Sequence, residues 1–346
     1  MSVALAIGTL KGAWVARSDD GRTWSVDGPY LKGWQVNTFG VAPDGTYLLS
    51  TGSTWYGAAL HRSSDLANWS QVVAGPAYEE DSGRKLEQIW TLAMAGRSLF
   101  AGVAQAGLFR SEDAGETWAP VEGFNDHPTR PGWQAGLGGL VAHRILVDAA
   151  DPERMWVGAS AVGVFATEDG GESWELRNDG VTRAAPDDDY PDIGFCVHGL
   201  VHDPDEADSI WRQDHTGVYR SRDGARTWQR IETGLPAGFG FPVGRDPQTG
   251  RLFVVPLESD EFRLPVNGEF AVYASDDAGD RWFRAGDWSR PGFDGVLRDA
   301  MAIDGNGGVY VGSTAGRVAL SADTGETWLE LDVTFPRIVS LHAFVI

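Results

Sequence analysis

The sequence predicts an all-β fold, and three observations narrow it to a seven-bladed β-propeller. A short motif recurs seven times at intervals of 46 to 56 residues, and such an interval holds four short strands with their turns. The 346 residues include 45 Gly and 15 Trp, a composition that suits short strands and tight turns around aromatic packing. One strand is missing before the first motif, and an extra strand follows the last one. We therefore expect residues 1–346 to form one domain.

The repeated motif follows the pattern Ser-x-Asp-x-Gly-x-Thr-Trp, which is complete at residues 111–118. An Asp at the start of a tight turn accepts backbone N–H bonds, Gly allows a positive φ, and Trp packs on the sheet. The pattern therefore predicts hairpins held by structural aspartates rather than by catalytic or calcium-binding ones. The copy at residues 63–69 is shortened. The seven aspartates are Asp19, Asp65, Asp113, Asp169, Asp223, Asp277 and Asp323.

This motif resembles the Asp-box, or BNR repeat, of sialidases, two-propeller xyloglucanases, sortilin-type receptors and photosystem assembly factors. The whole chain is similar to bacterial Asp-box proteins that are often labelled exo-sialidase-like or glycosyl hydrolase-like. In those families the box lies between the third and fourth strands of a blade, on the rim away from the substrate face. The resemblance implies that the chemistry belongs to other loops, and it transfers the fold better than the function.

The phasing of the strands around the motifs predicts how the ring closes. Before the first motif there is room for only two strands, residues 3–7 and 13–17, with residues 24–26 as a third. After the last motif, residues 328–333 complete a blade and residues 337–346 remain as an extra strand. We expect this extra strand to be the innermost strand of blade one, because closing the ring removes exposed sheet edges.

The first strand of each blade lines the central channel, so the residues at the channel mouth are candidates for chemistry. In four of these strands, an acidic residue follows the mouth residue by five positions, as Asp148 follows His143. In two others, the mouth residue is identified by an apolar residue two positions after it. The predicted ring consists of Asn37, Trp90, His143, His198, Phe241 and Asp299.

The loops between the second and third strands are predicted to reach the same face. Residues 258–263 form a long insert there that we expect to act as a lid or wall. Two other long loops, residues 122–139 and 179–193, enter blades four and five. Further residues expected on this face are Lys11, Trp55, Tyr56, Gln105 and His215.

Histidines gather on this face, and imidazole suits metal binding and acid–base chemistry. His143 and His198 hold equivalent places on neighbouring inner strands, and His215 reaches the same face from its loop. Three converging imidazoles predict a site for a divalent transition metal (zinc, manganese or iron) that activates a water. The alternative interpretation is a hydrogen-bonded network that fills the channel entrance and needs no cofactor.

The leading hypothesis is a hydrolase with this His-rich, metal-dependent site, acting on a small ester, phosphoester or related anionic substrate. The three histidines act as ligands or bases, and Asp299 orients one of them. Arginine binds anionic groups through paired hydrogen bonds, so Arg263 and Arg298 are expected to stabilise negative charge. The predicted substrate-binding residues are Arg130, Arg263, Arg298, Asp260, Asn37, Trp90, Trp55 and His127.

Two other functions stay open. A carbohydrate-active enzyme, either glycosidase or lyase, would pair Asp299 with Asp260 or Glu258. A sialidase matches poorly in detail, because an Arg-Ile-Pro segment near the start is absent and sialidases with this box have six blades. The third function is that of a non-catalytic binding or assembly factor. The tryptophans expected to stack on sugar rings are Trp34, Trp55, Trp90 and Trp133.

Composition limits the partners and the compartment. The formal net charge of -21 disfavours nucleic acid and anionic membranes, because phosphate binding relies on clustered Lys and Arg. The sequence indicates no secretion signal and no apolar run of about 18 residues that would span a membrane. The single cysteine, Cys196, is interpreted as a small buried hydrophobe. We therefore expect a cytoplasmic protein that binds a small molecule or a glycan.

Overall fold

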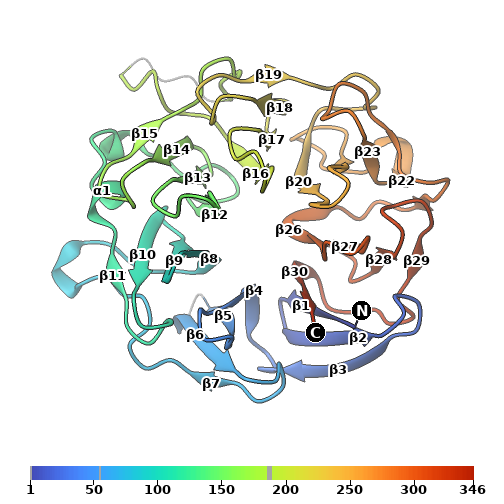
Figure 1. The fold of residues 1–346 in the computed structure, drawn as a ribbon, viewed down its shortest axis with the longest axis horizontal. Coiled ribbons are helices and arrows are strands. Elements are labelled where there is room, and N and C mark those ends of the chain that lie inside the picture. The colour runs from blue at the N-terminus through green and yellow to red at the C-terminus, as the bar shows by residue number, and fades with distance from the viewer. Residues whose placement is uncertain (1, 54–55, 185–188) are drawn as a thin grey trace.

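The computed structural model describes residues 2–53, 56–184 and 189–346, and short strands make up most of its regular structure. The sheets stand around a central axis like the blades of a propeller (Figure 1). No helix in the described part of the chain is both long and apolar enough to span a membrane. The helices are short turns, namely η1 (Glu80–Ser82), α1 (Glu122–Asn125), η2 (Arg130–Gly132) and η3 (Val266–Gly268).

Most sheets contain four strands, and the first strand of each lies nearest the axis (Figure 1). One sheet consists of β4 (Gln35–Val41), β5 (Tyr47–Ser53), β6 (Gly57–Ser63) and β7 (Ser70–Gln71). A second consists of β8 (Ile89–Ala95), β9 (Ser98–Val103), β10 (Gly107–Ser111) and β11 (Ala119–Pro120). A third consists of β12 (Ala142–Val147), β13 (Met155–Ala159), β14 (Gly163–Thr167) and β15 (Glu175–Leu176). A fourth consists of β16 (Val197–His202), β17 (Ile210–Asp214), β18 (Gly217–Ser221) and β19 (Gln229–Arg230). The fifth is β20 (Gly240–Arg245), β21 (Leu252–Pro256), β23 (Tyr273–Ser275) and β24 (Phe283–Arg284), beside the two-stranded β22 (Glu269–Phe270) and β25 (Arg290–Pro291).

The largest sheet has eight strands and includes both terminal strands. β30 pairs antiparallel with β1, from Val3 opposite Val345 to Thr9 opposite Ile338. A single parallel bridge between Asp299 and Ser340 joins β30 to β26. The order of strands is β29 (Leu329–Glu330), β28 (Val318–Ser321), β27 (Val309–Ser313), β26 (Val296–Ile303), β30 (Ile338–Val345), β1 (Val3–Thr9), β2 (Gly12–Ser18) and β3 (Ser25–Tyr30).

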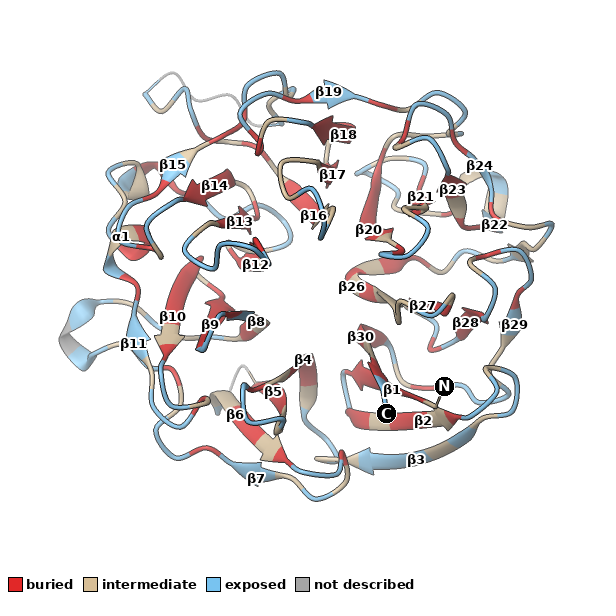
Figure 2. Ribbon diagram, in the orientation of Figure 1, coloured by how far each residue is buried: buried red, intermediate tan, exposed pale blue. Residues whose placement is uncertain are grey.

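The hydrophobic core lies between neighbouring sheets. Trp156 of β13 is fully buried and belongs to one cluster with Leu200 of β16 and Tyr219 of β18. In the same way, Phe253 of β21 shares a cluster with Tyr310 of β27. The outermost strands β3, β7 and β19 are largely exposed, as their pale blue colour shows (Figure 2). Each sheet is therefore stabilised by the apolar surface that it buries against its neighbours.

The repeated motif forms the turn that leads to the outermost strand of a sheet. Asp113 Oδ1 accepts the backbone N–H of Thr117 at 2.8 Å, and Oδ2 accepts the Thr117 hydroxyl at 2.5 Å. Ser111 Oγ donates to Asp113 and accepts the N–H of Gly115. The hydrogen bonds from Thr117 lower the pKa of Asp113, as expected for a carboxylate bound by donors. Aspartates bound by backbone N–H groups in the same way are Asp65, Asp169, Asp223, Asp277 and Asp323.

The aspartate predicted for the first copy is wrong by one residue. Asp20, not Asp19, accepts the backbone N–H groups of Arg22 and Thr23, at 2.8 and 2.7 Å. The first copy is one residue shorter than the full motif, like the copy at residues 63–69, and this shift moves the role to the second of two adjacent aspartates.

In the copies that end at Trp228, Trp282 and Trp328, the tryptophan ties a sheet to the one before it. Trp228 Nε1 donates to the backbone oxygen of Arg177 at 3.0 Å, and Trp282 Nε1 donates to that of Ile231 at 2.8 Å. Both indoles are almost fully buried. The motif therefore shapes a hairpin and also joins neighbouring sheets.

Candidate functional site at the axial ends of the sheets

A break in the ladder of hydrogen bonds marks the axial strands from β4 to β26. In β12, Ala142 pairs with Ala159 and Arg144 pairs with Gly158, so His143 is skipped. A break with one extra residue is a β-bulge, which bends a strand and re-aims its side chains. The break in β26 is larger, from Val296 to Met301, and Asp299 within it bridges to Ser340 of β30. The six positions aligned in the sequence therefore have equivalent places around the axis. The breaks fall on or across Asn37, Trp90, His143, His198, Phe241 and Asp299.

His143 is buried in the wall between two sheets. Its Nε2 lies 2.9 Å from the backbone oxygen of Val197 in β16, and its Nδ1 has no protein partner among the described residues. Burial, followed by the charges of Arg298 and Arg144, holds the pKa of His143 well below its usual value. The ring is therefore neutral near pH 7, and one of its nitrogens serves to join neighbouring axial strands.

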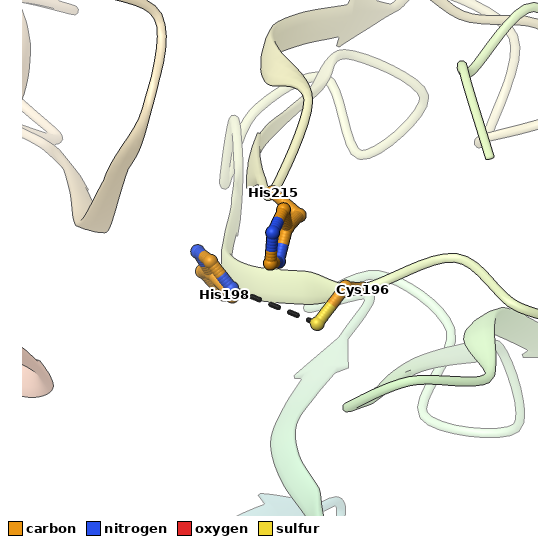
Figure 3. Close-up of side chains that lie close together, drawn as sticks. All are labelled: Cys196, His198 and His215. Atoms are coloured by element: carbon orange, nitrogen blue, oxygen red, sulfur yellow. Dashed lines mark hydrogen bonds between the residues drawn. The ribbon is translucent and has the colours of Figure 1, made fainter. Parts of the chain in front are cut away.

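His198 and His215 lie together, and the third member of their group is Cys196 (Figure 3). Cys196 Sγ and one nitrogen of each histidine lie within 4.8 Å of one another. The distance from Cys196 Sγ to His198 Nε2 is 3.7 Å. The structure thus brings together two of the three histidines expected to bind metal, and the group contains Cys196 rather than His143.

His215 also contacts the long insert. Its Nε2 lies 2.8 Å from Asp260 Oδ2, and its backbone N–H donates to Cys196 O at 3.1 Å. The hydrogen bond with the Cys196 side chain, and then the one with Asp260, raise the pKa of His215 to about 9 although burial opposes this. Burial also disfavours the Cys196 thiolate, but the contacts with His215 and the charge of Arg298 lower the pKa of Cys196.

Arg298 and Asp299 carry opposite charges to the axial end of β26. Asp299 Oδ1 accepts a hydrogen bond of 2.9 Å from Arg144 Nη2, and Asp299 Oδ2 has no protein partner among the described residues. β12 and β26 stand on opposite sides of the axis, so this ion pair crosses the channel (Figure 1). Burial raises the pKa of Asp299, although Arg144 and Arg298 oppose the shift.

Phe241 links this charged end of β26 to the Cys196 group. Its ring stacks on His198 with a centroid distance of 4.7 Å. The guanidinium carbons of Arg298 and Arg263 lie 5.7 and 5.6 Å from its centre. Arg263 Nε also donates to the backbone oxygen of Asp260 at 3.0 Å. The insert at residues 258–263 therefore reaches the channel mouth.

Several of the buried polar atoms that lack a protein partner in the described chain lie at or next to these breaks. Leaving such an atom unpaired costs about 1–3 kcal/mol, so folded proteins contain few of them. Those next to the axis indicate a place that is suited to a polar ligand. Within the described residues they include Asn37 Nδ2, Trp90 Nε1, His143 Nδ1, Arg298 Nε and Asp299 Oδ2.

A cavity of about 740 Å³ lies beside this ring. Its lining includes Trp90, Glu87 just before β8, and Arg130 and Gly138 in the loop after α1. A Cβ built on Gly138 would lie 2.6 Å from Arg298 Nη2, so the cavity wall and Arg298 are in contact. The loop that carries Gly138 therefore lines the cavity and also contacts Arg298 at the charged end of β26, although no β26 residue lines the cavity itself.

Other residues expected to bind substrate have structural partners. Arg130 donates to the backbone oxygens of Ala106 and Gln105, at 2.6 and 2.8 Å, and its guanidinium lies 4.6 Å from the ring centre of Trp133. Trp133 is 8% exposed and packs against Phe124, so its face is not available for stacking on a sugar. The remaining surface of Arg130 lines the cavity.

His127 lies at a different place from the Cys196 group. Its Nδ1 is 2.8 Å from Thr129 Oγ1, and it lines a second cavity of about 660 Å³ that shares no lining residue with the first. Trp55 and residues 185–188 fall outside the described residues. No role at the axis follows for His127 from these contacts.

Cys196 belongs to the site, although the sequence predicted it to be a small buried hydrophobe. It is half-buried beside two histidines. A signal was present, because side chains two residues apart on an extended segment share one side, and Cys196 and His198 have that spacing. Arg144 was also missed, since its contact with Asp299 crosses the channel and spacing along the chain does not show it.

The fold and its axial ring define a β-propeller protein. No family model matches the chain. Among curated proteins it is similar to an oligoxyloglucan-reducing end-specific xyloglucanase of Emericella nidulans, with 25% identity over 247 residues, 59% of this chain and 29% of that protein. A xyloglucanase of a Paenibacillus species is 28% identical over 274 residues, 66% of this chain and 25% of that protein. The matches thus span less than a third of these longer relatives.

Solved structures agree on the fold. The periplasmic gluconolactonase of Pseudomonas aeruginosa superposes with a TM-score of 0.64 at 15% identity, over 100% of this chain and 99% of that one. The hypothesis of a hydrolase for small esters or phosphoesters is wrong, because the curated relatives are named as xyloglucanases. That finding fits the carbohydrate-active alternative.

Proposed function

We propose that this chain is a carbohydrate-active propeller, a glycosidase that cleaves a glycan of the xyloglucan class at its axial ring. The likeness to three xyloglucanases, at 25–28% identity over 59–68% of the chain, carries the proposal. A neutral glycan also suits a chain with a net charge of -21, because its binding does not require a basic surface.

Asp299 has the properties of a general acid. Burial raises its pKa, so its carboxyl group keeps a proton at pH values at which an exposed aspartate has lost it. Arg144 holds Oδ1, and Oδ2 is the oxygen left to donate a proton to a glycosidic oxygen. Protonation of the leaving group by a carboxylic acid is the first requirement of most glycosidases.

Asp260 is the candidate for the second carboxylate. The hydrogen bond with His215 lowers the pKa of Asp260, so this group stays ionised when Asp299 is still protonated. Two carboxyl groups with pKa values shifted in opposite directions suit an acid and a base or nucleophile. Both lie near Phe241. Arg263 packs on the Phe241 ring and donates to the backbone oxygen of Asp260. Arg298, which precedes Asp299 in the sequence, packs on the same ring.

The cavity beside the ring has features of a sugar-binding surface. Trp90 lines it and offers a buried Nε1 donor without a protein partner, which a sugar hydroxyl would satisfy. Trp34 and Tyr56 form an exposed aromatic pair with ring centres 5.6 Å apart, and Tyr56 precedes Gly57 of the cavity lining. Aromatic rings with a few placed polar groups are typical of small-molecule sites.

The proposal includes the finer features of the fold. Seven blades are supported by seven motif copies and by the eight-stranded sheet, whose halves β26–β29 and β30–β3 meet through one bridge. The pairing of β30 with β1 supports closure of a single domain by the C-terminal strand. The aspartate turns support membership of the Asp-box proteins.

Xyloglucan oligosaccharides test this function directly. We expect the wild-type chain to bind them in a calorimeter and to release new reducing ends. Asp299→Asn should keep binding but lose about 10²–10⁴-fold in turnover, the usual contribution of acid catalysis. Asp332→Asn, which changes an exposed carboxylate, is the matched control. Absence of both binding and cleavage would exclude the glycan, and full turnover by Asp299→Asn would exclude this acid.

A further inference from the structure

Cys196, His198 and His215 surround one point at the channel mouth (Figure 3). We infer that they form a binding site for a thiolate-preferring divalent transition metal, with zinc as the natural probe. A zinc ion bound at 2.3 Å to sulfur and 2.0–2.1 Å to nitrogen holds those two atoms about 3.6 Å apart in a tetrahedron. The distance from Cys196 Sγ to His198 Nε2 is 3.7 Å. The site differs from the predicted one because Cys196 replaces His143.

The other nitrogen of each ring already has the partner that a metal ligand needs. His198 Nδ1 lies 2.7 Å from the backbone oxygen of Gly240, and His215 Nε2 lies 2.8 Å from Asp260 Oδ2. These contacts leave His198 Nε2 and His215 Nδ1 for the ion. Metal-bound histidines almost always donate their second N–H to a carbonyl or carboxylate, which orients the ring. Both rings are therefore oriented by these contacts, and His215 releases a proton when an ion binds, as metal ligation requires.

The backbone and the aromatic shell keep the three side chains in place. Cys196 and His198 flank Val197 at the start of β16, and the N–H of His215 is bonded to Cys196 O. Phe241 stacks on His198, and Phe239 meets both imidazoles edge-on, with centroid distances of 5.4 and 5.5 Å. Ligands that are held in place by packed rings and hydrogen bonds lose little entropy on binding an ion.

The donor set determines which ions fit. One thiolate and two imidazoles favour zinc and its chemical relatives over magnesium and calcium, which prefer oxygen ligands. Three protein ligands leave a fourth position for water or for an oxygen of a bound molecule, the arrangement of a catalytic rather than a structural zinc site. Arg298 lies near enough to Cys196 to act on its charge. The site shares Asp260 with the proposed glycosidase through its contact with His215, but the metal-binding test does not depend on that activity.

Metal binding by the full chain tests the inference without an activity assay. The protein is stripped with a chelator and dialysed, and then titrated with Zn²⁺ and with Co²⁺. We expect about one equivalent of Zn²⁺ per chain, as three ligands at one point define one ion. Cobalt in the same site should give an intense thiolate charge-transfer band and the strong visible absorption of tetrahedral Co²⁺. These spectra report on the wild type and do not depend on the folding of a variant.

Variants assign the ligands. Cys196→Ser should abolish the charge-transfer band, and His198→Asn should remove stoichiometric binding. Asp260→Asn should weaken Zn²⁺ binding about 10–100-fold, the usual effect of losing a carboxylate behind a ligand histidine. His202→Gln, on the same strand but bonded to Val147, is the matched control and should bind normally. Wild type that binds less than a tenth of an equivalent, or that gives no charge-transfer band, would overturn the site, as would unchanged binding by Cys196→Ser.

Discussion

The outer turns and the axial bulges occupy equivalent positions in successive sheets, but they use their side chains in opposite ways. The turns repeat one residue type, and the carboxylate of Asp113 is saturated by donors from its own hairpin. The bulges carry different residue types from sheet to sheet. Several of them, such as Asn37 and His143, keep a buried polar atom without a protein partner in the described chain.

This difference separates structure from function within one repeat. A turn must solve the same local problem in every sheet, so the same side chain recurs. A residue skipped in the pairing, such as Asn37 or His143, is not set in its identity by the pairing of its strand. Contacts of the bulge residues also reach much farther, since Arg144 and Asp299 lie 155 residues apart in the sequence.

The largest effect is expected from removing an axial strand. Deletion of residues 337–346 removes β30, which pairs along the length of β1 and also contacts β26. Because two strands lose their neighbour and the ring opens, we expect loss of the cooperative thermal transition. Calorimetry and circular dichroism measure this. A truncated chain that melts like the full one would show that the axial strand is as dispensable as an outer one.

A smaller effect is expected from one outer turn. Asp20→Ala removes the acceptor for the N–H groups of Arg22 and Thr23 and should lower the melting temperature by a few degrees, with glycan cleavage per folded molecule unchanged. Asp19→Ala is the control, because the exposed Asp19 bonds only to Ser2 in the described structure and should leave the melting temperature as it is. Equal effects of the two changes would contradict the one-residue shift in this copy.

The smallest effect concerns pH, and its sign should differ between the two regions. Hydrogen bonds from Ser173 lower the pKa of Asp169 from 3.8 to about 2. A folded-state pKa below the unfolded one contributes stability that is present above about pH 4 and is lost as the pH falls toward 2. Melting temperatures between pH 7 and 2 measure this loss. Asp169→Ala should reduce the acid dependence, and an unchanged curve would contradict the assignment.

Asp299 should show the opposite dependence. Its folded-state pKa is raised by burial, so its contribution is present below the ordinary aspartate range and is lost as the pH rises through the raised value. The stability of Asp299→Asn relative to that of the wild type should therefore be higher at neutral pH than at pH 4. A difference between the two proteins that does not vary with pH would show that this carboxyl group is not perturbed.

Local features of this fold were predictable from the sequence, and contacts between distant segments were not. The turn at Asp113 is dictated by its neighbours in the chain, and the mouth residues could be aligned by their distance from the end of each strand. The one-residue shift to Asp20 could also be read from the sequence, because the first copy has the same shortened length as residues 63–69. The group of Cys196 with His215 depends on how a loop folds back, and the pair of Arg144 with Asp299 depends on the width of the channel. The cytoplasmic location stays a prediction.

The bulges of the axial strands also bear on how such a protein changes over time. A residue that lies outside the ladder, as His143 and Trp90 do, is exchanged by a single codon change without rewriting the pairing of its strand. Selection is thus able to act on the reactive end of each blade while the repeats that hold the ring stay constant. A library confined to these positions would explore new chemistry on a scaffold whose assembly is already assured.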